Sequence, residues 1–173
     1  MSAKNPTVEQ IQNAAVTYSG SLARLAFTYL KSVDDAEDVV QDVFLSYLRT
    51  KPVFENEEHE RAWLIRTTIN RAKDVLKSAW MKKRADFPDG DLDDAIADGW
   101  PPRAESLSYL PMDETRVLDA VLALEEKYRT PLHLHYYGGY TIAEIASFLG
   151  EKPATVGTRL ARGRELLKKS LEE

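Results

Sequence analysis

Cationic side chains are the most concentrated chemistry in this 173-residue sequence, and they gather in two blocks. Residues 61–84 hold eight basic side chains and one acid, Asp74, and residues 152–169 hold six basic side chains and one acid, Glu165. Between them, residues 85–105 hold seven acids and one arginine, so the net charge of −5 hides a strong local asymmetry. Clustered lysine and arginine bind phosphates by displacing condensed counterions. The blocks therefore point to a nucleic acid, although each block alone also fits a solvated helix face.

The second basic block coincides with the spacing of two short helices joined by a tight turn. Thr141 and Glu144 form a capping box that starts the first helix, and Gly150 suits the left-handed conformation that ends it. Pro153, which is tolerated in a first helical turn, marks the second helix. This is the helix-turn-helix pattern. In the first helix we expect a buried set of Ile142, Ile145, Ala146 and Leu149.

The second helix of this pair presents hydroxyl and guanidinium groups that suit the major groove of DNA. At about 100° per residue, its buried stripe is expected to comprise Val156, Leu160, Gly163 and Leu167. The neighbouring arc, expected to face outward, comprises Thr155, Thr158, Arg159 and Arg162. Arginine pairs with guanine edges, and threonine meets phosphates or thymine methyl groups. An ordinary helical hairpin with a solvated arginine face is the alternative.

The pattern of the first basic block predicts one amphipathic helix with a polar row suited to single-stranded nucleic acid. Its expected buried face is Ile65, Ile69, Ala72, Leu76 and Ala79, and its opposite row is Arg66, Asn70, Lys73 and Lys77. Trp63 and Asp74 flank the row, with Trp80 and Phe54 close in sequence. Cations bind phosphates, an amide reads a base edge, and aromatic rings stack on bases. Trp63 as a plain core residue is the alternative, and the acidic turn of residues 55–58, which includes Asn56, is a candidate wall for an unstacked base.

A third helix, beginning after Ser32 and running to about Arg49, has an acidic outer face. Ser32 and Asp35 resemble a capping box. The expected buried side is Ala36, Val39, Val40, Val43 and Tyr47, and the exposed side is Asp34, Asp35, Asp38, Gln41 and Asp42. Such a ridge would be repelled by DNA, and it suits a basic protein partner. Compensation of the helix dipole is the alternative explanation.

The overall pattern predicts an all-α protein with two small helical domains joined by an acidic flexible linker. The expected boundaries are 1–84, 85–112 and 113–173, because prolines, glycines and aspartates concentrate between Phe87 and Pro111. The chain has no cysteine, no apolar run long enough to span a membrane, and no signal-peptide layout, so we expect a cytoplasmic protein.

Catalytic and metal-binding chemistry is not expected. His133 and His135 are two residues apart and would point to different helix faces, which argues against a metal pair. The acidic run of residues 34–38 superficially resembles a magnesium-binding motif of prenyl-diphosphate enzymes, but the chain lacks the second motif and the large apolar cavity that such enzymes need. We therefore expect no enzyme activity, no cofactor and no metal.

These segments together resemble the extracytoplasmic-function group of sigma-70-type factors, over residues 20–84 and 113–171. The resemblance lies in residues 35–44, in 63–66 with Asn70 and Asp74, in 140–146 and in 155–164. It implies a factor that binds core RNA polymerase and directs transcription from promoter DNA, with an anti-sigma protein as a further expected partner. The implied polymerase contacts are Asp38, Gln41 and Asp42. The implied minus-ten contacts are Phe54, Asn56, Trp63, Arg66, Asn70, Lys73, Asp74 and Lys77, and the implied minus-thirty-five contacts are Thr141, Lys152, Thr155, Thr158, Arg159 and Arg162.

Two departures from the family pattern bear on which promoters are read. Gly157 stands where the family usually has a long or basic residue, and Lys152 stands where it has a small polar cap. Glycine inside a helix costs about 1 kcal/mol relative to alanine and removes a DNA contact. The contacts would then shift toward Thr158, Arg159 and Arg162. A conventional helix-turn-helix regulator, with an N-terminal sensing or dimerisation domain, is the competing interpretation.

Overall fold

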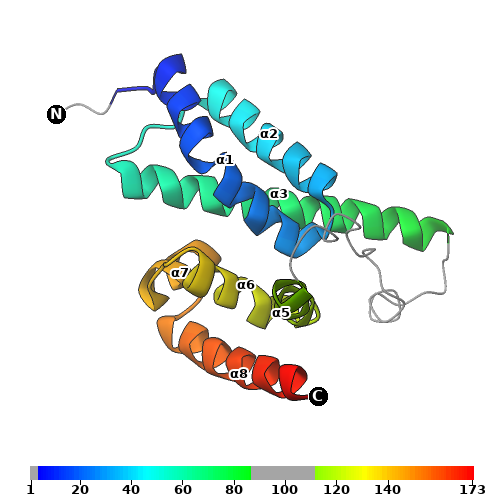
Figure 1. Ribbon diagram of the computed structural model, residues 1–173. Helices are drawn as coiled ribbons and strands as arrows, with labels where there is room; N and C mark the ends of the chain where they lie inside the picture. Colours follow the sequence, from blue (N-terminus) through cyan, green and yellow to red (C-terminus); the bar gives the residue numbers. More distant parts are fainter. Residues whose placement is uncertain (1–3, 87–111) are drawn as a thin grey trace. The chain divides into compact units, whose positions relative to one another are not determined.

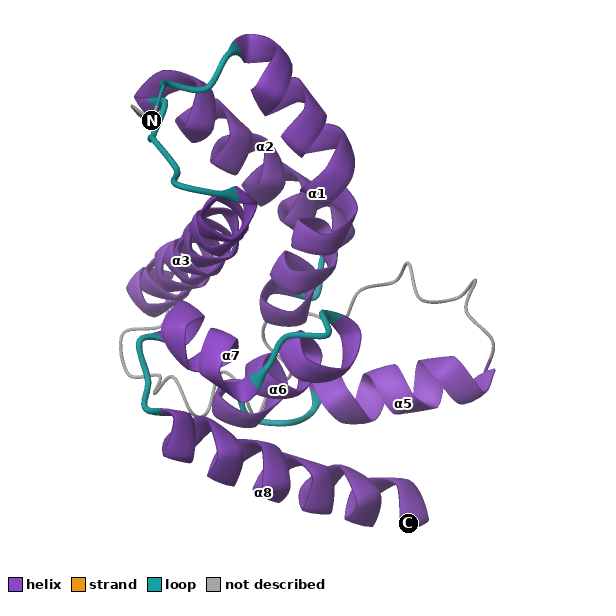
Figure 2. Cartoon of the chain, turned by 90° about the vertical axis from the view of Figure 1, so that its left-hand side faces the viewer, coloured by secondary structure: helices purple, strands orange, loops and turns teal. Residues whose placement is uncertain are grey.

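The computed structural model describes residues 4–86 and 112–173, and the chain divides into two compact units, residues 1–104 and 105–173. In the described ranges all regular structure is helical (Figures 1 and 2). The predicted all-α class is therefore confirmed. The expected acidic linker lies almost entirely outside the described residues.

The N-terminal unit consists of three helices whose ends follow local capping rules. Helix α1 spans Val8–Leu30, α2 spans Val33–Thr50 and α3 spans Glu57–Asp86. The Ser32 hydroxyl accepts a hydrogen bond from the backbone N–H of Asp35 at 3.2 Å, which confirms the predicted start of α2. At the other end, α2 runs one residue past the predicted Arg49 and stops at Lys51, whose φ of 43° is left-handed.

Helices α1, α2 and α3 enclose one hydrophobic core. Tyr29, Val39, Val43 and Leu64 are each at most 1% exposed. The predicted buried set of α2 is confirmed in full: Ala36, Val39, Val40, Val43 and Tyr47. Burial of a large apolar side chain contributes roughly 1.5–3 kcal/mol relative to leaving it exposed, so this contact surface is what holds α3 in place.

The buried face of α3 is shorter than its sequence pattern predicts. Ile65, Ile69 and Ala72 are buried as expected, but Leu76 is only half-buried and Ala79 is exposed. At 30 residues, α3 is longer than both of its partners, and its last turns run past them (Figure 1). The helical period continues there, but among the described residues of this unit α1 and α2 end before these turns (Figure 1). The side chain of Trp80 lies outside the described residues.

The C-terminal unit contains α5 (Met112–Leu122), α6 (Glu126–Leu132), a π-helical turn η2 (His133–Tyr137), α7 (Ile142–Leu149) and α8 (Pro153–Glu172). The capping box that starts α7 is confirmed. The Thr141 hydroxyl accepts from the Glu144 N–H at 3.2 Å, and the Glu144 carboxylate accepts from the Thr141 N–H at 2.8 Å. Gly150 is left-handed with φ 65°, and Pro153 occupies the first turn of α8, so the helix-turn-helix is present as predicted.

Some of the predicted core positions of this unit are wrong. In α7, Ile145 and Ala146 are buried, but Ile142 is 37% exposed and Leu149 is half-buried. Phe148 is buried instead, with its ring edge-on to Tyr140 at 5.0 Å. In an eight-residue helix, packing against α8 and η2 decides which side is covered, and the first turn protrudes past that contact. The core stripe of α8 buries Val156, Leu160 and Gly163, while Leu167 is half-buried near the open end.

Candidate protein and nucleic-acid interfaces

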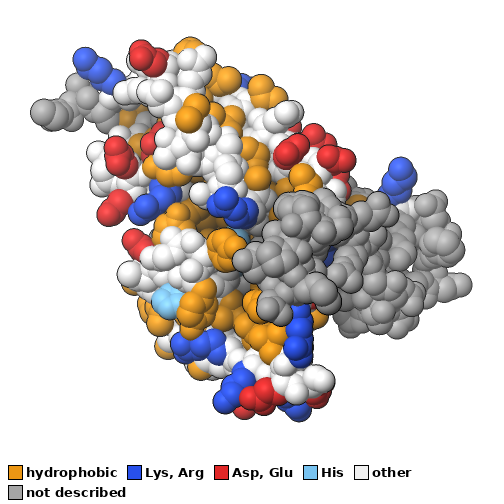
Figure 3. Space-filling view, viewed as in Figure 1, with side chains coloured by type: hydrophobic (Ala, Val, Ile, Leu, Met, Phe, Trp, Pro, Cys, Tyr) orange, Lys and Arg blue, Asp and Glu red, His pale blue; other side chains and the backbone are white. Residues whose placement is uncertain are grey.

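The exposed face of α2 is acidic in its first half and apolar in its second. Asp34, Asp35, Asp38, Gln41 and Asp42 are all exposed, as predicted, and Figure 3 shows acidic side chains gathered over this part of the N-terminal unit. Leu45, seven residues after Asp38 and therefore on the same side, is 61% exposed, and Leu48 is 38% exposed. The leucines were missed by charge-based reasoning. A face that combines carboxylates with leucines is suited to a protein surface.

The predicted polar row lies on the solvent side of α3. Arg66, Asn70, Lys73 and Lys77 are all exposed. At about 1.5 Å of rise per residue they extend over roughly 16 Å of helix. Asp74 is also exposed, beside this row. The row therefore forms a continuous strip that offers charge and one amide to an extended ligand.

An aromatic cluster stands at the N-terminal end of this strip. Trp63 is half-buried, with its ring centroid 5.4 Å from that of Tyr47 and 5.8 Å from that of Phe54. Phe54 is also edge-on to Tyr47 at 5.6 Å and to His59 at 5.3 Å. The structure thus brings together Phe54 and Trp63, two of the residues that the resemblance implies as minus-ten contacts. Trp63 contributes to packing and still leaves part of its indole at the surface. A core role and a role in stacking on a base are therefore compatible for this residue.

Buried hydrogen bonding holds this cluster in place from below. Tyr47 is 1% exposed, and its hydroxyl donates a hydrogen bond to the Glu60 carboxylate of α3. Burial, together with this hydrogen bond, raises the pKa of the Tyr47 phenol far above its usual value, so the hydroxyl remains a donor. Tyr47 therefore links α2 to the first turn of α3 directly beneath Trp63.

Asn56, which was expected near an unstacked base, forms hydrogen bonds at the start of α3. Its side-chain oxygen accepts a hydrogen bond from the His59 N–H at 2.8 Å, and its backbone carbonyl accepts from the Glu60 N–H at 3.2 Å. Asn56 therefore caps α3. The side chain is exposed, and its amide NH₂ remains as the group that it can offer outward.

The outward face of α8 differs from the predicted arc. Thr158 and Arg162 are exposed, but Thr155 and Arg159 are half-buried. Arg159 precedes the buried Gly163 by one turn, which places it at the edge of the packed side rather than on the outward face. The residues that line the outward face are Ala154, Thr158, Ala161, Arg162 and Glu165.

Several polar groups near α8 are held by partners inside the unit. Arg162 Nη1 lies 2.9 Å from Glu165 Oε2, and Arg159 Nη1 lies 3.1 Å from Glu151 Oε1. The Thr158 hydroxyl donates to the Ala154 carbonyl at 3.0 Å. By contrast, Lys152 makes no side-chain capping bond at the start of α8 and is exposed. The three-residue spacing of Arg162 and Glu165 is visible in the sequence, whereas the Arg159–Glu151 pair depends on the course of the turn before α8.

Two glycines of α8 have different roles. A Cβ at Gly163 would lie 2.9 Å from Leu132 Cδ1, so glycine there permits α8 to approach α6 closely. A Cβ at Gly157 would meet only Ile142 Cδ1 at 4.0 Å, an ordinary contact. The packing of α8 on α6 therefore favours glycine at position 163, whereas it sets no steric limit at position 157.

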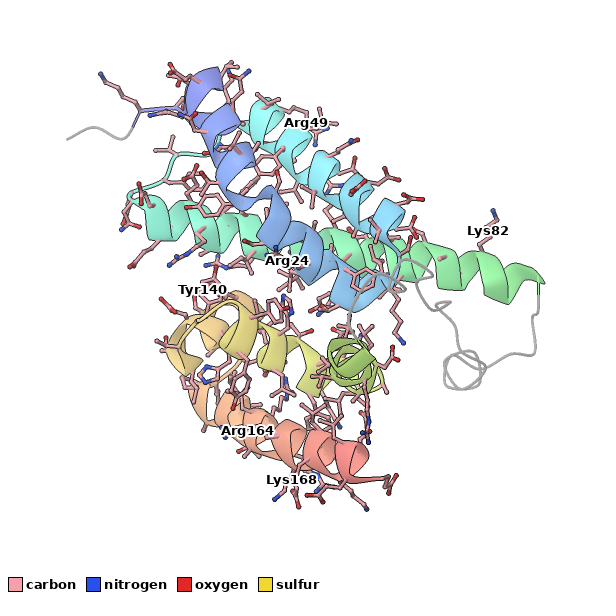
Figure 4. All side chains as sticks on the ribbon, viewed as in Figure 1. Arg24, Arg49, Lys82, Tyr140, Arg164 and Lys168 are labelled. Carbon is pink, nitrogen blue, oxygen red and sulfur yellow. The ribbon has the colours of Figure 1, made fainter. Side chains whose placement is uncertain are left out.

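One polar contact near the turn η2 was not predicted. Arg164 Nη1 donates to the Tyr136 hydroxyl at 2.8 Å, joining α8 to η2 (Figure 4). His133 stacks on Tyr137, while the His135 ring bonds through Nδ1 to the Tyr140 carbonyl at 2.9 Å. The two histidines thus have separate partners. Over residues 4–86 and 112–173, no three histidine or acidic side chains are grouped to hold a metal ion, and no helix there is long and apolar enough to cross a membrane.

Comparisons with known proteins match both units. The family profile described as Sigma-70 region 2 matches residues 15–82, and the profile described as Sigma-70, region 4 matches residues 114–167. The ECF RNA polymerase sigma factor SigW of Bacillus subtilis is 29% identical over 166 residues, covering 90% of this chain and 86% of SigW. The RNA polymerase sigma factor SigV of the same organism is 27% identical over 168 residues, covering 97% of this chain and 95% of SigV.

Two solved structures share the fold. The sigma factor RpoE of Bartonella quintana, in complex with the anti-sigma factor NepR, matches with a TM-score of 0.72 and 21% identity, covering 95% of this chain and 98% of that chain. CnrH, in complex with the cytosolic domain of CnrY, matches with a TM-score of 0.70 and 21% identity, covering 96% and 90%.

Proposed function

This chain belongs to the sigma-70 family, in its extracytoplasmic-function group, and we propose a division of work among its three exposed surfaces. As an RNA polymerase sigma factor, it directs transcription initiation at specific promoters. The proposal concerns which residues carry each step. The observation that carries it is the strip of Arg66, Asn70, Lys73 and Lys77, with Trp63 at its head.

The exposed face of α2 binds core RNA polymerase through Asp38, Gln41 and Asp42. Carboxylates and an amide that all face solvent offer charge-assisted hydrogen bonds to a basic protein surface. Leu45, on the same side, adds apolar contact area. The same acids would repel DNA phosphates, so this face is suited to a protein partner and not to DNA.

The strip on α3 captures the melted minus-ten strand. Arg66, Lys73 and Lys77 bind its phosphates, while Asn70 is placed among them to read a base edge. Trp63 and Phe54, held by the buried Tyr47, provide rings on which an unstacked base can lie. Asn56 contributes its amide NH₂ from the cap of α3, and Asp74 borders the strip. Unstacking a base costs a few kcal/mol, and binding to the extruded base offsets that cost.

The α7–α8 pair reads the minus-thirty-five duplex. Thr158 and Arg162 face outward from the first half of α8, where helices of this kind enter the major groove. Thr155 and Arg159 act from the edge of that face, and Lys152 and Thr141 lie near the starts of the two helices, where they can contact phosphates.

We also propose a cytoplasmic location, an anti-sigma partner and no catalytic chemistry in the chain itself. The relatives are RNA polymerase sigma factors, and two structures of similar fold are complexes with an anti-sigma factor or with the cytosolic domain of another protein. The competing interpretation, a conventional helix-turn-helix regulator, is not favoured because the N-terminal unit matches Sigma-70 region 2.

The test is reconstitution with core RNA polymerase. The purified chain should co-elute with core polymerase at modest salt and should produce specific transcripts from double-stranded promoters found by mapping start sites after overexpression. A double variant on α2 and a control substitution on α1 locate the polymerase contact. Asp38→Asn with Asp42→Asn should weaken binding to core polymerase, whereas Glu9→Gln on α1 should not. Normal binding by the α2 double variant would refute the assignment of that face.

A further inference from the structure

The arginines of the reading helix are held by carboxylates at both ends of its reading segment. Arg162 pairs with Glu165 at 2.9 Å on the outward face, and Arg159 pairs with Glu151, which lies in the turn before α8, at 3.1 Å. The hydrogen bond to Glu165 raises the pKa of the Arg162 guanidinium. Glu165 remains 70% exposed, so its charge faces whatever approaches this side of the helix.

These ion pairs affect the binding of a phosphate and the binding of a base edge differently. A phosphate that approaches Arg162 meets the negative charge of Glu165 within a few ångströms, a range at which salt screens little because the Debye length is about 8 Å at physiological ionic strength. A guanine edge is uncharged and presents two acceptors, so it experiences no comparable repulsion. A guanidinium carries five N–H donors, and one edge can bond Glu165 while another remains for a base.

We infer that Glu165 is a specificity-determining residue, which positions Arg162 toward a base edge and discourages its use on phosphates, with Glu151 acting likewise on Arg159. This inference rests on the proposed role of α8 in reading duplex DNA. It explains why acids stand beside the arginines of a surface that binds a polyanion. Glu165 acts through Arg162 and is a positioning residue.

The chain contains a matched control for this idea. Glu172 is on the same helix, is 68% exposed, and pairs with Lys168 at 4.0 Å. It lies seven residues after Glu165, about 10 Å farther along the helix axis. Glu165→Gln and Glu172→Gln therefore change net charge equally, but only the first removes charge beside Arg162.

The experiment uses the full chain bound to core RNA polymerase. Binding to a promoter duplex and to a scrambled duplex of equal composition is measured over a range of salt concentrations. Glu165→Gln should tighten binding to the scrambled duplex about threefold to fivefold and steepen the salt dependence by about 0.9 in slope, the value for one added phosphate contact. The ratio of promoter to scrambled affinity should fall accordingly. Glu172→Gln should leave that ratio unchanged, and Glu151→Gln should act in the same direction as Glu165→Gln but less, because Arg159 is half-buried.

A double-mutant cycle tests whether Glu165 acts through Arg162. In an Arg162→Ala background, Glu165→Gln should no longer change the affinity ratio. The inference is overturned if the effect persists in that background, or if Glu165→Gln and Glu172→Gln tighten scrambled binding equally. The proposed function of α8 has a separate test. If Arg162→Ala binds the promoter duplex as tightly as the unmodified chain does, α8 does not read that duplex through Arg162. Thermal unfolding of each variant confirms that folding is unchanged.

Discussion

The two surfaces proposed to bind DNA, on α3 and on α8, carry different side chains and would solve different recognition problems. The α3 surface places half-buried aromatic rings beside a row of cations, and its rings are anchored by the buried Tyr47. The α8 surface has no rings, and Thr158 and Arg162 stand among small neighbours such as Ala154 and Ala161. A ring binds the flat face of a base, which is accessible only after the strands separate. A guanidinium binds the edge of a base, which is accessible within the duplex.

The largest expected effect comes from removing the half-buried indole ring of Trp63 from the α3 surface. Trp63→Ala should reduce strand opening about 10- to 100-fold, because stacking on one aromatic side chain contributes about 1–3 kcal/mol per base. Permanganate reactivity of minus-ten thymines measures opening, with binding to core polymerase as the control. Trp63→Phe retains a ring and should preserve most of the opening. Equal loss in both variants would mean that packing, not stacking, is the role of Trp63.

The contrast between the two surfaces predicts that a single substitution on either one impairs a different step of initiation. Asn70→Ala should reduce open-complex formation about tenfold while sparing polymerase binding and closed-duplex recognition. Arg162→Ala should instead weaken upstream duplex binding about tenfold and relax its sequence preference. Footprinting of closed complexes at low temperature, followed by permanganate probing on warming, measures the two steps on one sample. If Asn70→Ala opened promoters normally, the assignment of the α3 strip would be wrong.

The two glycines of α8 predict opposite changes in stability. Gly163→Ala should destabilise the C-terminal unit by about 1 kcal/mol, because its Cβ would lie 2.9 Å from Leu132 Cδ1 and 3.3 Å from Tyr128 Cβ, so both neighbours must give way. Gly157→Ala should stabilise the unit by about 0.5–1 kcal/mol, since alanine favours helix and the added Cβ meets only an ordinary contact. Chemical denaturation measures both. A destabilising Gly157→Ala would show that the first half of α8 needs flexibility.

The smallest expected effect tests how the rings of the α3 surface are anchored. Tyr47→Phe removes the hydrogen bond to Glu60 and should cost about 0.5–1.5 kcal/mol near pH 7. Because the folded state raises the pKa of Tyr47, the stabilisation that this phenol provides is complete below about pH 10 and is lost as the pH rises above it. The stability gap between the unmodified chain and Tyr47→Phe should therefore be constant up to about pH 9 and shrink as the pH is raised from about 10 to about 11, as measured by urea unfolding. A constant gap would contradict the raised pKa.

The reliability of sequence reasoning differed between these regions for a physical reason. In α2 the whole buried face was predicted, because two long partners cover the helix along its length and the 3.6-residue period alone then decides burial. In α3 the same reasoning failed at Ala79, beyond the ends of its partners. In α7 the same reasoning predicted that Ile142 is buried, whereas the structure buries Phe148 and leaves Ile142 exposed. A two-turn helix buries whichever side its neighbours cover.

The sequence by itself determined the features that depend on near neighbours in the chain. These are the capping box of Thr141 and Glu144, the cap at Ser32, the left-handed Gly150 and the helical periods, which depend on residues within about four positions of one another, and the two basic blocks, which are continuous in the sequence. Only the tertiary structure decided how Tyr47 supports Trp63, and that Gly163 rather than Gly157 stands where a Cβ would crowd a neighbouring helix. Those outcomes depend on distances between helices, and a linear pattern carries no information about such distances until the helices pack.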